Sequence, residues 1–165
     1  MLSIPIETPH IKPIRDARFG NDFWKKDHLK TIAQAYRYAP FFGDYYPTLE
    51  AIFYSHPHSL EQLNTDLTTT IARWLDITTH IVDSAYWHFN GDAVDMIIQM
   101  CQAVDAHTYL STIGAKDYIG IDEELRIASS GITHEWLEFK DPDEEPLSAI
   151  HHLFNLGPEA ERLIQ

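Results

Sequence analysis

Apolar residues recur every three or four positions along several stretches of the chain, and this spacing predicts amphipathic helices. The first such helix, from Trp24 to Ala39, should end before Pro40, because the residue preceding a proline is pushed out of helical geometry. A second helix should begin after Ser59, which forms a capping-box pattern with Gln62. Further helices are predicted over residues 47–53, with Pro47 at the first position, and over 92–104, 122–130 and 148–154.

Other segments have the composition or the alternation of β-strands. Residues 77–82 are rich in β-branched side chains, residues 2–6 form a short apolar run, and residues 108–111 are a further short strand candidate. Ile132, His134 and Trp136 alternate with the residues between them, which indicates a strand with two unlike faces. Strands that alternate with helices predict the α/β class: a single layered domain over residues 1–165, with a small mixed sheet flanked by amphipathic helices.

The composition is that of a folded protein and narrows the choice of partners. A chain of 165 residues with 44% hydrophobic and 12% aromatic residues is long enough to bury one core. Twelve basic residues against 25 acidic ones give a formal net charge of -13. This charge repels phosphate backbones, so neither nucleic acid nor an anionic membrane surface is an expected partner.

The cysteine content and the lack of export signals predict a cytoplasmic protein. Cys101 has no second cysteine with which to form an internal disulfide, which favours a reducing compartment. No run approaches the roughly 20 apolar residues that cross a bilayer, and the first residues lack the basic flank and apolar core of a signal peptide. We therefore expect no membrane insertion.

Two common classes of reactive site find little support. Cys101 lies on the apolar stripe of a predicted helix without a basic neighbour, so we interpret it as a core residue rather than a nucleophile. The histidines at positions 56, 58, 151 and 152 lack the spacing of a metal site with three or four ligands. The usual nucleotide-binding and hydrolase motifs are missing as well, so no metal and no cofactor are predicted.

Two segments carry the candidate chemistry. His28 lies in the middle of the first apolar stripe, so its imidazole is either hydrogen-bonded within the core or exposed in a cleft. In residues 109–118, a strand ending in Ser111 is followed by a glycine and a small residue. This pattern is found in loops that approach a ligand through backbone N–H groups, and equally in ordinary turns. Lys116 in the same segment either holds an anion or is solvated.

Three segments together resemble the WbqC-like family and extend over most of the chain. The first, within residues 24–42, is W-x-x-x-H, followed by Tyr36 and then by A-P-F-F. The second, residues 109–118, begins with Y-L-S and ends with A-K-D-Y. The third, residues 147–157, begins with L-S-A-I and continues through L-F-N to Gly157. Thr112 replaces a usual glycine, and His151 replaces an expected aspartate. Family members normally begin with a further segment, so we interpret residues 1–165 as an N-terminally incomplete WbqC-like domain.

The resemblance implies a role in bacterial cell-surface polysaccharide biosynthesis, O-antigen synthesis in particular. It further implies an acyl or aminoacyl (glycine) transferase that acts on an amino sugar, with a small sugar or amino acid as substrate. In this interpretation His28 is the general base, because an imidazole exchanges protons near neutral pH. The matching positions that are expected to bind substrate are Trp24, Tyr36, Tyr109, Ser111, Lys116, Tyr118 and Asn155.

A second interpretation remains open: a non-catalytic partner, or an inactive remnant, of a polysaccharide assembly system. The substitution at His151 and the expected loss of the N-terminal segment favour it. Replacing His28 with alanine separates the two, because a catalytic histidine affects activity and a structural one affects stability.

Overall fold

The computed structural model describes residues 2–7, 14–55, 59–84, 87–137 and 147–163. Contacts divide the chain into two compact units, Met1–Val82 with Pro146–Gln165, and Asp83–Glu145. Each unit buries hydrophobic side chains of its own. The described residues form six α-helices and a two-stranded parallel sheet, which confirms the predicted α/β class.

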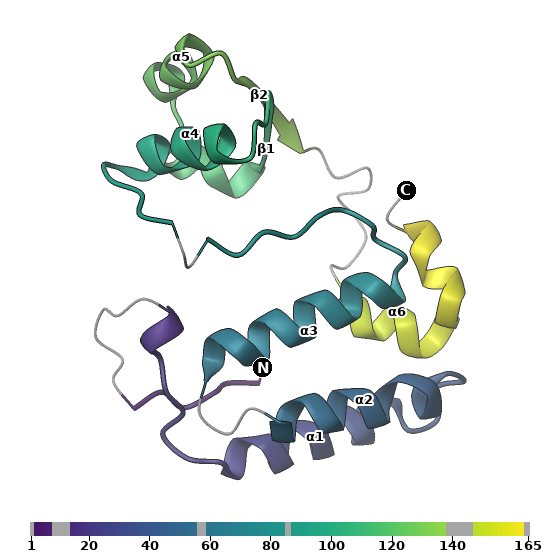
Figure 1. The fold of residues 1–165 in the computed structure, drawn as a ribbon. Helices are drawn as coiled ribbons and strands as arrows, with labels where there is room; N and C mark the ends of the chain where they lie inside the picture. Colours follow the sequence, from purple (N-terminus) through teal and green to yellow (C-terminus); the bar gives the residue numbers. More distant parts are fainter. Residues whose placement is uncertain (1, 8–13, 56–58, 85–86, 138–146, 164–165) are drawn as a thin grey trace. The chain divides into compact units, whose positions relative to one another are not determined.

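The first unit is helical. It contains α1 (Phe23–Tyr36), α2 (Phe42–Ser55), α3 (Leu60–Trp74) and α6 (Ala149–Leu156), with 3-10 turns at Ile14–Asp16 and Gly157–Leu163. Helix α2 packs against α1 and α3, and α6 returns from the C-terminal end of the chain to pack against α2 and α3 (Figure 1). The elements at the two ends of the chain therefore belong to one compact unit.

Local signals explain where two of these helices lie. The buried face of α1 includes Trp24, His28 and Ile32 of the predicted stripe together with Leu29, and the helix ends at Tyr36 rather than at Ala39. Ser59 caps α3 as predicted, because its side-chain oxygen accepts a hydrogen bond from the backbone N–H of Gln62 at 3.3 Å. Both features are local in sequence, and both were visible without the structure.

Helix α6 supplies the centre of the larger core of this unit. Leu153 and Phe154 are fully buried there. The helix ends at Gly157, whose φ of 59° is unfavourable for other residues. A Cβ atom at this position would lie 2.6 Å from the ring of Phe41, so the close approach of that ring also requires glycine.

The second unit carries the sheet. It contains α4 (Ala93–Ala103), β1 (Thr108–Thr112), α5 (Ile121–Ser129) and β2 (Thr133–Leu137), with a 3-10 turn at Ile113–Asp117. The strands are parallel, so a crossover is needed between them, and α5 provides it. Tyr109 lies opposite His134, and Ser111 lies opposite Trp136. Tyr109 and Trp136 pack against a core that includes residues of α4 and α5.

Three predicted elements differ from the observed ones. Residues 77–82 form no strand, and Ile6 makes only an isolated bridge to Phe19. Both segments have strand-like composition, but neither finds a neighbour with which to complete a ladder. Helix α2 begins at Phe42, so Pro47 lies inside it rather than at its first position. None of the described helices is long and apolar enough to cross a membrane.

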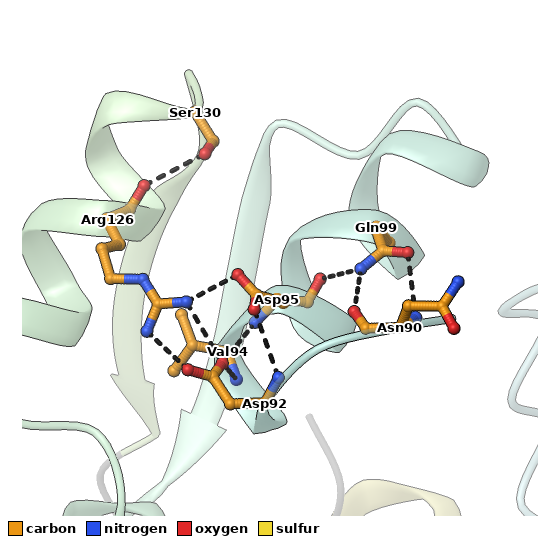
Figure 2. A network of polar contacts seen from close by, with 7 residues as sticks. All are labelled: Asn90, Asp92, Val94, Asp95, Gln99, Arg126 and Ser130. Carbon is orange, nitrogen blue, oxygen red and sulfur yellow. Dashed lines mark hydrogen bonds and ion pairs between the residues drawn. The ribbon is translucent and has the colours of Figure 1, made fainter.

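A polar network joins α4 to α5 (Figure 2). Asp92 caps α4, because its Oδ1 accepts hydrogen bonds from the backbone N–H groups of Val94 and Asp95, both at 2.9 Å. Arg126 of α5 then binds Asp92 Oδ2 at 2.8 Å and Asp95 Oδ1 at 2.6 Å. Gln99 extends the network to the backbone of Asn90. The guanidinium thus holds the start of one helix against the other.

This network predicts a pH-dependent part of the stability of the second unit. The hydrogen bond from Arg126, followed by that from the backbone of Asp95, lowers the pKa of Asp92 from 3.8 to about 2. A carboxyl group with a lowered pKa stabilises the folded state above its unfolded pKa and loses this contribution as the pH falls through the folded value. We therefore expect the wild type to exceed Asp92→Asn in stability at pH 5, and the difference to shrink between about pH 4 and pH 2.

Urea denaturation of both proteins over this pH range measures the difference. The asparagine retains an oxygen that caps the helix, so the variant removes mainly the charge. A stability difference that does not change with pH would contradict the prediction.

Candidate functional site

The site residues predicted from the sequence fall into two groups, one in each unit. Trp24, His28, Tyr36 and Asn155 lie in the first unit, and Tyr109, Ser111, Lys116 and Tyr118 lie in the second. The structure brings members of each group close to one another within their own unit.

His28 is packed within the core of the first unit. Its Nε2 atom lies 3.1 Å from the backbone oxygen of Ser3, and its ring lies beside those of Trp24 and Phe53, with centroids 5.1 and 6.4 Å away. A carbonyl oxygen only accepts, so Nε2 carries a proton and donates it. His28 is 8% exposed. These contacts are typical of a structural histidine, and its role as general base stays a prediction.

We expect His28→Ala to lower the free energy of unfolding by about 1–3 kcal/mol, because it removes the hydrogen bond to Ser3 and the ring contacts of a buried side chain. Lys30→Ala, on the exposed side of the same helix, is the matched control and should change stability by less than about 0.5 kcal/mol. Chemical denaturation followed by tryptophan fluorescence measures both. Unchanged stability of His28→Ala would refute the structural role.

The other predicted residues of the first unit also make contacts within the fold. The ring of Tyr36 packs against those of His151 and Phe154, with centroids 5.7 and 5.1 Å away. Asn155 donates a hydrogen bond from Nδ2 to the backbone oxygen of His151 at 2.8 Å. Trp24 is buried, and its Nε1 has no hydrogen-bond partner among the described residues.

The second unit gathers a serine, a histidine and a glutamate. Because side chains alternate along a strand, Tyr109 and Ser111 share a face of the sheet with His134 and Trp136. Ser111 Oγ lies 2.6 Å from His134 Nε2, and the Tyr109 ring stacks on the imidazole at 5.6 Å. Ser111 is 5% exposed, so its hydroxyl fixes the imidazole from the buried side.

Glu124 of α5 reaches the other end of the imidazole. Its Oε1 accepts a hydrogen bond from Trp136 Nε1 at 3.1 Å and lies 3.5 Å from His134 Nδ1. The second distance is that of an ion pair but is long for a hydrogen bond. His134 Nδ1 is therefore buried without a hydrogen-bond partner among the described residues, next to a carboxylate that is 43% exposed.

An open pocket adjoins this group. It has a volume of about 610 Å³ and is lined by Glu124, Ala128, Gly131, Ile132, Thr133, His134 and Trp136. Ser111 does not line the pocket; its hydroxyl contacts the imidazole of His134, which does. An imidazole beside a carboxylate in a pocket wall is a suitable acid–base group.

The remaining predicted residues surround this group. Lys116 places Nζ 5.2 Å from the centroid of the Trp136 ring. Burial, and then the adjacent Tyr118 hydroxyl, raise the pKa of Tyr109 above its usual value, so Tyr109 stays protonated at neutral pH. Tyr118 and Lys116 are exposed and available to a ligand. Within the described part of the chain, no cluster of three or more metal-ligating side chains occurs.

Sequence reasoning missed His134 and Glu124. The alternation of Ile132, His134 and Trp136 predicted their strand, and a histidine on the face shared with Trp136 was the available signal. The pairing with Ser111 joins positions 23 residues apart, and no motif of fixed spacing connects them.

Fold and site together define an α/β protein with a histidine–carboxylate pair in the wall of a pocket. The chain belongs to the WbqC-like protein family, whose model matches residues 1–163. This match gives no support to the expected loss of an N-terminal segment.

A curated relative is also found. The chain is 25% identical over 169 residues to an uncharacterized protein, Rv1507c, of Mycobacterium tuberculosis (strain ATCC 25618 / H37Rv), with 96% of this chain and 73% of the relative covered. No solved structure matches the chain.

Proposed function

We propose that the protein transfers an acyl or aminoacyl group to the amine of an amino sugar in bacterial cell-surface polysaccharide (O-antigen) biosynthesis, and that His134 is the general base. The resemblance of the chain to the WbqC-like family supports the pathway. The observation that carries the chemistry is the alignment of Ser111, His134 and Glu124 at a pocket.

The proposed transfer follows from the two nitrogens of His134. Nε2 is hydrogen-bonded to Ser111 Oγ, and Nδ1 lies beside the carboxylate of Glu124. The imidazole of His134 accepts a proton from the amine as the amine nitrogen attacks the carbonyl carbon of the donor. The new N–C bond forms, the bond to the leaving group breaks, and the imidazolium returns its proton to that group.

The neighbouring residues support this step in different ways. Ser111 orients the imidazole, and the carboxylate of Glu124 stabilises the imidazolium by its charge. Lys116 and Tyr118 are proposed to contact the substrate from the exposed edge of the group. His134 thereby replaces His28 as our candidate for the base.

A product assay tests the proposal. The purified protein is incubated with glycyl and acetyl thioesters and with amino sugars, and mass spectrometry detects the amide. Formation of an amide that requires the folded protein supports the proposal. If every combination of donor and amino sugar stays unreacted, the non-catalytic partner becomes the preferred function.

A further inference from the structure

Formal charge is concentrated in the second unit. Asp83–Glu145 contains 14 of the 25 acidic residues and three of the 12 basic ones, so it carries -11 of the chain's net charge of -13. One of the three cations, Arg126, is already paired with Asp92 and Asp95. A unit with an excess of one sign attracts ligands of the opposite sign, so this unit favours the approach of a cation.

The pocket contains groups that suit a positively charged ligand. Its lining includes the carboxylate of Glu124 and neither lysine nor arginine. Oε1 of that carboxylate is engaged by Trp136, whereas Oε2 has no hydrogen-bond or ion-pair partner among the described residues. His134 also lines the pocket; its side chain is 5% exposed, and its Nδ1, which has no hydrogen-bond partner among the described residues, lies 3.5 Å from Oε1 of the same carboxylate.

The Trp136 ring in the wall of the pocket already faces a cation of the protein itself. The ammonium of Lys116 already lies 5.2 Å from the centroid of the Trp136 ring. This distance is within the range over which an aromatic ring attracts a positive charge. The ring is therefore engaged by Lys116, and the pocket group whose chemistry is complementary to a primary ammonium is the carboxylate of Glu124, which is 43% exposed.

We propose that this pocket binds its substrate through a protonated primary amine, which donates a hydrogen bond to Glu124 Oε2 and lies beside the imidazole of His134. The inference rests on the proposed function, from which it takes the amine of an amino sugar as the group that is bound. It adds that the pocket recognises this amine in its protonated form. Before transfer the ammonium loses one proton to solvent through the open pocket, which leaves the neutral amine as nucleophile.

The proposed site has a consequence for turnover. The amide product is neutral, so it loses the ion pair with Glu124 that held the substrate. The same pocket therefore discriminates between substrate and product, and the net charge of the unit contributes to this discrimination at low salt.

Binding of two sugars that differ only at the amine tests the inference. We use glucosamine, which is cationic, and N-acetylglucosamine, which is neutral, and measure both by isothermal titration calorimetry. The variants are Glu124→Gln and the matched control Glu135→Gln, which removes the same charge from the exposed, opposite face of β2. The amide introduced by Glu124→Gln keeps an oxygen that accepts from Trp136, so the fold around the pocket is retained.

We expect glucosamine to bind the wild type and Glu135→Gln with similar affinity and to bind Glu124→Gln about tenfold to a hundredfold more weakly, the range for a charge-assisted hydrogen bond. N-acetylglucosamine should bind all three proteins weakly, and added salt should weaken only glucosamine binding. Equal affinity for the two sugars, equal effects of the two variants, or no detectable glucosamine binding would overturn the inference.

Failure of the site and failure of the proposed function give different results, because the binding measurement needs no acyl donor. Selective glucosamine binding without any amide product leaves the ammonium site intact and rejects the transfer reaction. Amide formation without selectivity for the cationic sugar rejects the ammonium site and leaves the transfer reaction intact.

Discussion

Replacement of His134 with glutamine should reduce the rate of amide formation by about 10²–10⁴-fold, the usual contribution of a general base. Glutamine keeps the side chain polar and retains an atom within reach of Ser111, but it accepts no proton in this pH range. The imidazole is the only group that joins Ser111 Oγ, at 2.6 Å, to the carboxylate of Glu124, at 3.5 Å, among the described contacts. The rate is measured with saturating donor and amino sugar in the mass-spectrometric assay.

Two histidine variants serve as controls for this loss. His107→Gln changes an exposed histidine of the same unit and should leave the rate within about twofold. His28→Gln tests the base predicted from the sequence, and the rate per folded molecule should be unchanged if its role is structural. A His134→Gln protein with nearly wild-type rate, or a selective loss in His28→Gln, would assign the base elsewhere.

The helices could be predicted from the sequence because their signals are local. The stripe of α1 and the cap of α3 depend on residues within a few turns of each other, and both have the predicted form. Strands depend on partners that are distant in sequence. The β-branched residues 77–82 have the composition of a strand and find no partner, whereas β1 and β2 pair across an intervening helix.

The same distinction explains which part of the site was foreseen. Ser111 was identified from a segment whose residues are adjacent in the chain, and it does belong to the observed group. His134 became visible only through the parallel register, which puts Tyr109 opposite it. His28 attracted attention because it interrupts an apolar stripe, yet its partner, the backbone oxygen of Ser3, has no signature in the sequence.

Truncation of Phe154 should produce the largest loss of stability. Its side chain is fully buried in α6 and packs against the rings of Tyr36 and Phe42, with centroids 5.1 and 5.4 Å away. Phe154→Ala should lower the free energy of unfolding by about 3–5 kcal/mol, because the variant loses both the buried area and the contacts around the resulting cavity. Phe154→Leu retains most of the volume and should cost considerably less. Urea denaturation followed by tryptophan fluorescence measures both, and a loss below about 1 kcal/mol for the alanine variant would contradict the packing.

A matched truncation in the second unit extends this experiment to the domain organisation. Ile127 is also fully buried, in the core of Asp83–Glu145, and Ile127→Ala should cost about 2–5 kcal/mol. The sequence predicts a single domain over residues 1–165, and a single domain unfolds in one cooperative step. Phe154→Ala and Ile127→Ala should then shift the same transition, whichever unit carries the probe. Two transitions, each shifted by only one of the variants, would mean that the two units fold independently and would refute the single-domain prediction.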